Sequence, residues 1–467
     1  MNFASANLVF DTDIIRRFDV NGPRYTSYPT ADRFNDSFGP ERYAYWLQAR
    51  GSAAGDEATR PLSLYFHIPF CNTICYYCGC NKIITKDHGR SAKYIRYLAK
   101  ELALQSKLLT GPHDVIQLHF GGGTPTFLSD DEMRTLMGHI KEHFNLLPGG
   151  EYSIEVDPRK VDAQTVALLG EVGFNRMSIG VQDFDAAVQK AVNRIQSEEE
   201  TLDVIRAARA NGFNSISIDL IYGLPFQTVE GFERTLDRII AADPDRLSIY
   251  NYAHLPKLFM PQRRIGEADL PSADSKLQIL SRAIRKLTDA GYVFIGMDHF
   301  AKPTDEMAIA QQKGELHRNF QGYSTHSDCD LLAFGISALS KVGRSYGQNV
   351  KTLDEYYGCL DEGVLPVYRG IELDDDDVLR RELITQLMCH FQLSMPAVEA
   401  QWGIRFREYF APELADLQTM VDGGLVRLED DAIVVLPKGR MLVRVIAMAF
   451  DKFLRQGRQE ARYSKVI

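Results

Sequence analysis

From residue 61 onward, short apolar runs rich in β-branched residues alternate with longer stretches in which apolar residues recur every three or four positions. The short runs predict buried strands, and the longer stretches predict amphipathic helices. The expected strands are residues 63–68, 115–120, 152–156, 176–181, 215–222, 246–252 and 292–300. Strands that alternate with helices predict a parallel sheet, so we expect an α/β fold with a partial or full TIM-like (β/α) barrel. An open doubly wound sheet is the alternative.

The regions outside this alternation predict three further parts. Residues 1–60 contain Pro and Gly residues that interrupt the chain and show little hydrophobic periodicity. This indicates an N-terminal arm that wraps another domain. We take residues 61–300 as the barrel and 301–370, where the alternation fails, as an extension at the substrate site. Residues 371–467 read as a small, mostly helical domain of winged-helix type with one short β pair.

The overall charge limits the classes of partner. The chain has 53 Lys and Arg against 62 Asp and Glu, a net charge of −9, which argues against a broad nucleic-acid surface. Residues 438–467 are locally basic, and a solvated helix face packing on the barrel is favoured over a nucleic-acid contact. Asp11 and Asp13 interrupt the first apolar residues, and no run of 18 apolar residues exists. We therefore expect a cytoplasmic protein, without a membrane span, that is monomeric.

Four of the seven cysteines, Cys71, Cys75, Cys78 and Cys80, lie in one loop after the first expected strand. A disulfide framework is not expected in a reducing compartment. A structural zinc site is the alternative, but it usually needs a second ligand pair, and none of comparable spacing follows. Three thiolates in the spacing CxxxCxxC suit a four-iron cluster in which one iron lacks a protein ligand. The scattered cysteines Cys329, Cys359 and Cys389 fit small buried hydrophobes.

Polar residues close several of the expected strands. "GGGTPT" (121–126) follows the second strand, Glu155 and Gln182 end the third and fourth, and Asp219, Asn251 and Ala253 lie at or near the ends of the fifth and sixth. Ligands bind at the carboxyl ends of the strands in a parallel barrel, and buried carboxylates are costly unless paired. Any one of these groups could be a cap or a loop contact, but together they predict a site at this rim.

The cysteine spacing identifies the chain as a member of the radical S-adenosylmethionine (SAM) superfamily, in which the open iron holds SAM and one electron from the cluster yields a 5′-deoxyadenosyl radical. The wider pattern resembles one family within it, the oxygen-independent coproporphyrinogen III oxidases. The resemblance covers nearly the whole chain and includes "GPRYTSYPT" (22–30), "YFHIPFCNTICYYCGCNKI" (65–83), "FGGGTPTFL" (120–128), "SIEVDPR" (153–159), "DLIYGLP" (219–225) and "LHRNFQGY" (316–323).

The resemblance implies one [4Fe-4S] cluster on Cys71, Cys75 and Cys78, and two bound SAM molecules. It implies SAM contacts at Tyr65, Tyr77, Gly122, Gly123, Thr124, Glu155, Gln182, Arg194, Asp219, Ala253 and Leu339. Tyr77 stands where many relatives have Phe, and Leu339 where Ile is common. Cys80 matches a fourth cysteine of the family, a functional residue without an assigned ligand role, and a packed thiol is its alternative.

The implied reaction converts two propionate side chains of coproporphyrinogen III to vinyl groups, giving protoporphyrinogen IX in haem biosynthesis. It needs an electron donor and an electron acceptor that the sequence does not identify. The substrate has four carboxylates, and charges more than about 8 Å away are screened, so local cations decide its binding. Candidates for forked carboxylate contacts are Arg24, Arg318, Arg263 and Arg264, and Tyr25, Tyr28 and Phe320 could give flat contacts.

Two other functions remain open from the sequence. A haem-binding carrier related to this family would share the cysteine loop, but such relatives typically lack the "RYTSYPT" arm and the CxC extension, which are both present here. A zinc-stabilised binding module without catalytic activity is the second alternative.

Overall fold

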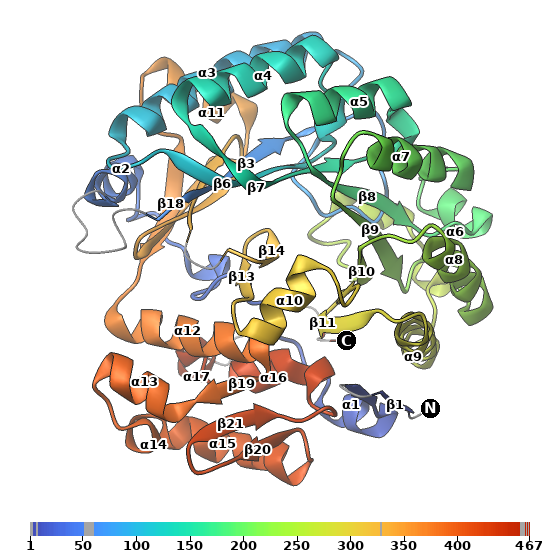
Figure 1. Ribbon diagram of the computed structural model, residues 1–467, viewed down its shortest axis with the longest axis vertical. Helices are drawn as coiled ribbons and strands as arrows, with labels where there is room; N and C mark the ends of the chain where they lie inside the picture. The colour runs from blue at the N-terminus through green and yellow to red at the C-terminus, as the bar shows by residue number, and fades with distance from the viewer. Residues whose placement is uncertain are drawn as a thin grey trace.

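The centre of the molecule is a curved sheet whose middle strands run parallel (Figure 1). The computed structural model describes residues 3–5, 8–50, 60–326, 329–457, 463, 465 and 467. The parallel strands are β3 (Leu62–Ile68), β6 (Asp114–Gly122), β7 (Asn145–Val156), β8 (Arg176–Gln182), β9 (Ser215–Tyr222), β10 (Arg246–Asn251) and β15 (Asp330–Phe334). All but β15 were predicted, because strands buried on both faces are continuous apolar runs.

Antiparallel strands complete both edges of this sheet. Beyond β10 lie β12 (His299–Ala301) and β11 (Val293–Gly296), which form a hairpin. The prediction of a single strand over 292–300 is wrong, because Met297 adopts a positive φ of 51° and turns the chain. Beyond β15 lie β16 (Leu339–Val342), β17 (Ser345–Asn349) and β18 (Val367–Glu372).

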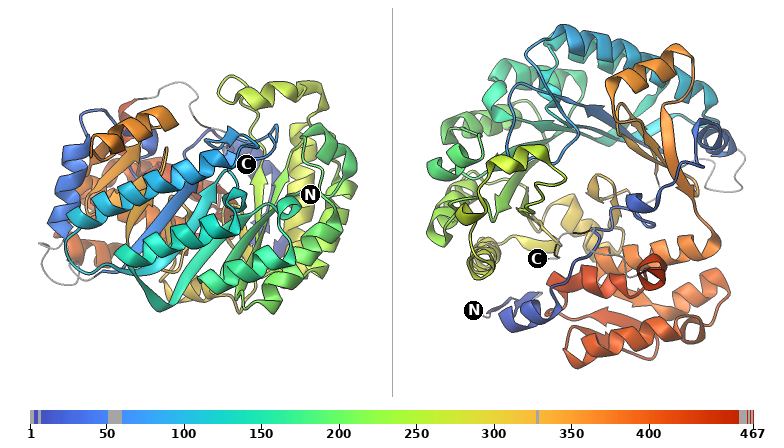
Figure 2. Two further views of the ribbon diagram at one scale, coloured as in Figure 1. Left: turned by 90° about the horizontal axis from the view of Figure 1, so that it is seen from above. Right: turned by 180° about the vertical axis from the view of Figure 1, so that it is seen from behind.

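The resulting sheet has twelve strands in the order β11-β12-β10-β9-β8-β7-β6-β3-β15-β16-β17-β18. Its two edge strands, β11 and β18, do not pair with each other in the described part of the chain. The fold is therefore a partial barrel. It is not a full barrel, because these edge strands leave it open. It is not a doubly wound sheet either, because the connecting helices cover only the convex face (Figures 1 and 2).

The helices of this outer layer are α3 (Gly89–Leu108), α4 (Asp130–His143), α5 (Ala163–Val172), α7 (Glu198–Ala210), α8 (Val229–Ala241) and α9 (Ala273–Asp289). Alternate residues of β3 divide between the two faces of the sheet. Phe66 is fully buried and stacks on Phe334 at 4.8 Å in the core. Tyr65 faces the concave side, where it stacks on His119 at 5.9 Å. The sheet thus presents polar and aromatic side chains to its hollow side.

The N-terminal arm connects the two ends of the molecule. Its first elements, β1 (Phe3–Ser5), β2 (Leu8–Phe10) and α1 (Thr12–Phe18), lie beside the C-terminal domain, and α2 (Pro40–Ala49) lies at the far edge of the sheet (Figure 2). Between them the arm crosses the open side of the sheet, and the backbone of Asn35 pairs with Gly370. Segment 301–370 contributes α10 (Glu306–Lys313) and the hairpin β13 (His317–Asn319)–β14 (Gly322–Ser324), which lie between sheet and C-terminal domain, and α11 (Leu353–Asp361).

The C-terminal domain is mostly helical. Its helices are α12 (Asp375–His390), α13 (Met395–Trp402), α14 (Phe406–Tyr409), α15 (Ala411–Asp422), α16 (Val443–Met448) and α17 (Lys452–Gln456). A small sheet of β19 (Gln392–Ser394), β21 (Ala432–Val435) and β20 (Val426–Leu428) adds one strand to the predicted β pair. Residues 371 and 372 belong to β18, so the domain begins after them.

The basic residues near the C-terminus are engaged within the protein where they are described. Arg444 is buried, Lys452 forms ion pairs with Asp374, Asp376 and Asp377, and Arg455 pairs with Asp416. Arg458 and Arg462 of this basic segment lie outside the described residues. A search of the described helices finds none that is both long and apolar enough to span a bilayer.

Candidate functional site

The cysteine loop is fastened to the carboxyl end of β6. Its ends form the short parallel pair β4 (Phe70–Cys71) and β5 (Ile83–Ile84). The amide of Gly123 donates to the Ile68 carbonyl at 2.8 Å, and the amide of Thr124 donates to the Phe70 carbonyl at 2.8 Å. The Thr124 hydroxyl lies 3.4 Å from the Cys71 sulfur. The glycine-rich turn therefore fixes the position of the first cysteine.

Two arginines reach the sulfur of Cys75. Nη1 of Arg194 lies 3.7 Å from this sulfur and Nη2 of Arg159 lies 3.8 Å from it. Asp157 holds both guanidinium groups, at 2.6 Å from Arg159 and 3.5 Å from Arg194. Adjacent cations stabilise a thiolate, which is the form that binds iron. Arg194 was predicted as a SAM contact. Asp157 and Arg159 were not assigned a role, although "DPR" after the third strand was their signal.

The remaining thiols differ in their surroundings. The Cys80 thiol donates a hydrogen bond to Cys78 and, with Lys82, lowers the pKa of Cys78 to about 6. Burial raises the pKa of Cys71 to about 11, although the Thr124 hydroxyl opposes this effect. Tyr77, between two of the expected ligands, is half-buried, and its carbonyl accepts a hydrogen bond from Gln262 at 3.0 Å. Cys80 thus lies next to an expected ligand.

The loop fits an iron–sulfur cluster better than a zinc ion. All the described cysteines are free, and no group of three or more His, Cys, Asp or Glu side chains in the described residues is close enough to hold a single metal ion. Thiolates that bind different irons of a cluster stand farther apart than the ligands of one zinc. Three thiols on one loop, with cations at Cys75, are a donor set suited to such a cluster.

Glu155 organises the strand ends beside this loop. Its carboxylate accepts a hydrogen bond from the Gly122 amide at 3.1 Å and lies 3.4 Å from Nε2 of His119. Burial alone would raise the pKa of Glu155, but His119 and the Gly122 amide hold it below its usual value. The hydroxyl of Tyr65 lies 3.1 Å from Nδ1 of His67. These contacts place an ionised carboxylate at the rim of the barrel.

Asp219 on β9 is the contrasting carboxyl group. Burial raises its pKa to about 6, although the Ser178 hydroxyl donates to it at 2.9 Å. Glu155 and Asp219 both line a cavity of about 180 Å³ in the concave face of the sheet, together with Tyr250 and His299. The cavity therefore joins predicted SAM contacts from two different strands.

Two amide oxygens at this rim are buried without a hydrogen-bond partner in the described residues: Oε1 of Gln182 and Oδ1 of Asn251. Gln182 also has a φ of +67°, in the left-handed region. Buried polar atoms are nearly always paired, so unpaired ones at a strand end indicate a missing polar ligand. Asn251 and Ala253 line a second cavity of about 560 Å³ between the arm and α9. Leu339 begins β16, toward the opposite edge of the sheet from β10, and packs near Phe34.

The residues expected at the substrate are divided between two places. Arg24 and Arg318 lie near the concave cavity: Arg24 is 5.8 Å from the Tyr250 ring, and Arg318 is 4.7 Å from the Tyr323 ring. Arg263 and Arg264 are exposed on the 3-10 helix Met260–Arg264, with Arg264 5.0 Å from the Tyr76 ring.

The predicted flat contacts are held by the protein itself. The Tyr25 hydroxyl donates to Asp451 at 2.9 Å, and the Tyr28 hydroxyl accepts from the Lys452 amide at 3.0 Å. Phe320 packs edge-on against Tyr346, with ring centroids 5.5 Å apart. Tyr25 and Tyr28 thus tie the arm to the C-terminal domain.

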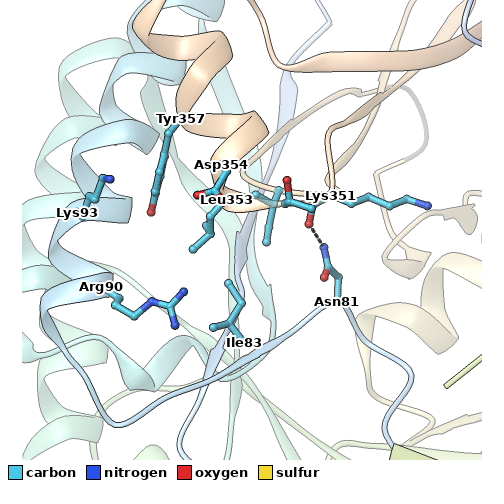
Figure 3. Close-up of a pocket in the computed structure, with 10 residues that line it drawn as sticks. Asn81, Ile83, Arg90, Lys93, Lys351, Leu353, Asp354 and Tyr357 are labelled. Atoms are coloured by element: carbon cyan, nitrogen blue, oxygen red, sulfur yellow. Dashed lines mark hydrogen bonds between the residues drawn. The ribbon is translucent and has the colours of Figure 1, made fainter. Parts of the chain in front are cut away.

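A further hollow lies on the outer side of the cysteine loop (Figure 3). It has a volume of about 450 Å³ and is lined by Arg90, Lys93, Asp354 and Tyr357, among others. The Asn81 side chain donates to the Lys351 carbonyl at 3.0 Å along one wall. None of the predicted site residues lines this hollow, so it is separate from the rim of the barrel.

The chain is similar to known proteins over nearly its whole length. The radical SAM superfamily model matches residues 65–239, and the HemN C-terminal domain model matches residues 373–442. The oxygen-independent coproporphyrinogen III oxidase of Pseudomonas aeruginosa is 52% identical, over 98% of this chain and 99% of the relative. That of Escherichia coli is 48% identical over 98% of both chains. The solved structure of coproporphyrinogen III oxidase (HemN) from Escherichia coli aligns with a TM-score of 0.91 and 47% identity, covering 96% of this chain and all of the other.

Proposed function

The chain belongs to the family of oxygen-independent coproporphyrinogen III oxidases within the radical SAM superfamily, and from this membership we infer that it oxidatively decarboxylates coproporphyrinogen III. Each of two propionate side chains loses one hydrogen atom from its β-carbon, CO2 and one electron, and becomes a vinyl group. The product is protoporphyrinogen IX, a step in haem biosynthesis. A separate donor supplies the electron for the cluster, and an acceptor takes the electron from each propionate.

The observation that best supports this proposal is the cysteine loop with its two arginines. Cys71, Cys75 and Cys78 would hold one [4Fe-4S] cluster, and Cys75 would do so as a thiolate stabilised by Arg159 and Arg194. When bound, the cluster and SAM would supply a one-electron cleavage that generates a carbon radical able to take hydrogen from an unactivated carbon.

The residues around the loop would bind and orient SAM. Glu155 is held ionised and is available to a cationic amino or hydroxyl group, while the unpaired amide oxygens of Gln182 and Asn251 accept further hydrogen bonds. We assign the adenine contact to the Tyr77 ring, and Asp219 lines the concave cavity. We assign the remaining SAM contacts to Tyr65, Gly122, Gly123, Thr124, Ala253 and Leu339, divided between two SAM molecules.

The four arginines predicted to bind the substrate lie at different distances from the concave cavity. Arg24 and Arg318 contact the rings of Tyr250 and Tyr323, which line the concave cavity. Arg263 and Arg264 are exposed beside the cysteine loop, so they would contact only a part of the substrate that extends out of the cavity. Tyr25 would act by holding the arm in place through Asp451.

The proposal is tested by anaerobic incubation of the full-length holoprotein with SAM, dithionite and coproporphyrinogen III. We expect 5′-deoxyadenosine and CO2 in step with protoporphyrinogen formation. A Cys75→Ser variant should lose both products and the iron–sulfur absorbance. The matched Cys359→Ser variant, which changes a cysteine in α11 that is not an expected cluster ligand, should keep them.

Three results would contradict the proposal. The wild-type protein could cleave SAM without forming CO2, which would indicate another substrate. It could bind haem tightly without turnover, which would indicate a carrier. Finally, Cys75→Ser could retain both products, and the cysteine loop would then not hold the catalytic cluster.

A further inference from the structure

Three arginines from distant segments meet below the concave cavity. Arg24 comes from the N-terminal arm, Arg318 from β13 and Arg444 from α16. Arg24 is ion-paired with Asp298 at the β11–β12 turn. Arg444 donates to the backbone carbonyls of Pro23 and Gly22. Burial and its two arginine neighbours lower the pKa of Arg444 to about 10, whereas Asp298 opposes them. The cluster therefore contains two buried arginines, Arg318 and Arg444, beside the ion-paired Arg24.

Arg318 differs from the other two arginines. Only 7% of the residue is exposed, yet neither Nε nor Nη1 has a hydrogen-bond partner among the described residues. The ring of Tyr323 lies 4.7 Å below the guanidinium and contributes a cation–π contact, but this leaves the N–H groups unpaired. A buried charged group without partners costs several kcal/mol, so the position favours an anion.

The space around Arg318 suits a carboxylate group. The residue lines a small cavity of about 30 Å³ with Ser27, Phe320 and Asn319. Asn319 also lines the larger concave cavity that contains Asp219. A ligand with its carboxylate at Arg318 can therefore extend past Asn319 toward the strand ends.

We propose that Arg318 anchors a propionate carboxylate of the tetrapyrrole that is not the reacting one, through a forked pair of hydrogen bonds from two adjacent N–H groups of its guanidinium, one of them unpaired among the described residues. This assignment rests on the proposed function, because it takes coproporphyrinogen III as the substrate. Arg24 and Arg444 raise the positive potential at the anchor, and Asp298 keeps Arg24 oriented. The Tyr323 ring holds the guanidinium plane in place.

The anchor is tested by equilibrium binding to the anaerobic holoprotein. The probe is coproporphyrin III, the stable oxidised form of the substrate, titrated while its fluorescence is followed. We expect Arg318→Gln to raise the Kd by about 10- to 100-fold, the range for losing a hydrogen-bonded charge pair. Arg318→Lys keeps the charge but loses the fork, so its Kd should lie between those of wild type and Arg318→Gln.

A matched control removes the same charge elsewhere. Arg134→Gln changes an exposed arginine on α4, on the convex face, and should leave the Kd within twofold of wild type. The Kd for SAM should stay within twofold of wild type in all three variants, because neither Arg318 nor Arg134 is an expected SAM contact. If Arg318→Gln does not fold, Arg318→Lys alone decides the test.

The outcomes separate the anchor from the proposed function. If the wild-type protein forms protoporphyrinogen but both Arg318 variants bind coproporphyrin III as tightly as wild type, the anchor is wrong and the function stands. If the wild-type protein binds coproporphyrin III through Arg318 but releases no CO2, the proposed function is wrong and the anchor stands. Equal weakening by Arg134→Gln would reduce the effect to overall charge and overturn the anchor.

Discussion

Gly123 is the position where the smallest change should have the largest effect on the cysteine loop. A methyl group placed at Gly123 would lie 2.6 Å from the carbonyl carbon and 2.7 Å from the carbonyl oxygen of Pro69, and 2.8 Å from the carbonyl oxygen of Phe70. All three atoms are backbone, so no side chain can rotate to relieve the contact. Gly123→Ala must therefore move the β4 segment away from the end of β6.

The size of the effect follows from what this movement disturbs. Overpacking a tight contact costs about 1–3 kcal/mol. The hydrogen bonds from Gly123 to Ile68 and from Thr124 to Phe70 would be lengthened as well, and each is worth about 1 kcal/mol net. We expect Gly123→Ala to lose about 2–5 kcal/mol of the free energy that fixes Cys71 in the loop. That loss should leave most of the protein without its cluster.

The assay compares iron and sulfide content, visible absorbance and thermal unfolding after anaerobic reconstitution. Gly138→Ala is the control, because Gly138 lies within α4 and a methyl group there would contact nothing within 4 Å. Alanine in a helix should stabilise this variant by about 0.5–1 kcal/mol. The reasoning is refuted if Gly123→Ala incorporates as much iron as wild type and unfolds at the same temperature.

Two further predictions concern buried polar groups. Asparagine tolerates the left-handed φ of Gln182, so Gln182→Asn should not lower the unfolding temperature of the SAM-free protein. The same variant should raise the Kd for SAM about 10-fold, because it shortens the side chain that carries the unpaired amide oxygen. An unchanged Kd in calorimetry would exclude Gln182 as a contact. Burial raises the pKa of Glu101 to about 7, against the hydrogen bonds from Tyr356 and Gly335. The folded protein then binds this proton more tightly than the unfolded chain, so stability should fall by about 3 kcal/mol as pH rises from about 4.5 to 7. Thermal unfolding of wild type relative to Glu101→Gln should show this decline between about pH 4.5 and 7, and parallel curves would contradict it.

The sequence predicted the parallel strands well because each is a local signal. Runs such as "SISIDLIY" are apolar enough to be buried on both faces, whatever their neighbours are. The apolar run over 292–300 was wrongly predicted as one strand, because it contains a turn. Gly296 has a φ of +154° and Met297 one of +51°, and only the glycine signalled the break.

The sequence of a strand does not specify which other strand it pairs with. β15 pairs in parallel with β3, with Asp330 opposite Leu62, and so extends the sheet on the side opposite β6. No pattern within residues 330–334 specifies a partner so far away in the chain. The prediction therefore ended the parallel series at residue 300.

The candidate site also combines local features, which the sequence predicted, with contacts between distant segments, which it did not. The spacing of Cys71, Cys75 and Cys78 is local, and the sequence located it. The cations that stabilise Cys75 are not local: Arg159 follows β7 and Arg194 follows α6 (Ala186–Ala191), and both reach the sulfur with long side chains. Where such a side chain ends depends on tertiary packing, which the sequence pattern does not describe.

The same dependence on tertiary packing gives the C-terminal domain a structural role at the site. Arg444 of that domain holds the carbonyls of Gly22 and Pro23, and Asp451 accepts a hydrogen bond from Tyr25. These contacts fix the arm on both sides of Arg24, whose guanidinium then lies against the Tyr250 ring that lines the concave cavity. An acidic chain can accept an anionic substrate in this way, because screening beyond about 8 Å leaves the local arrangement of guanidinium groups to determine the potential at the site. The positive charge that Arg24, Arg318 and Arg444 bring beside the cavity is therefore a property of the assembled arm, hairpin and C-terminal domain, and not of the barrel alone.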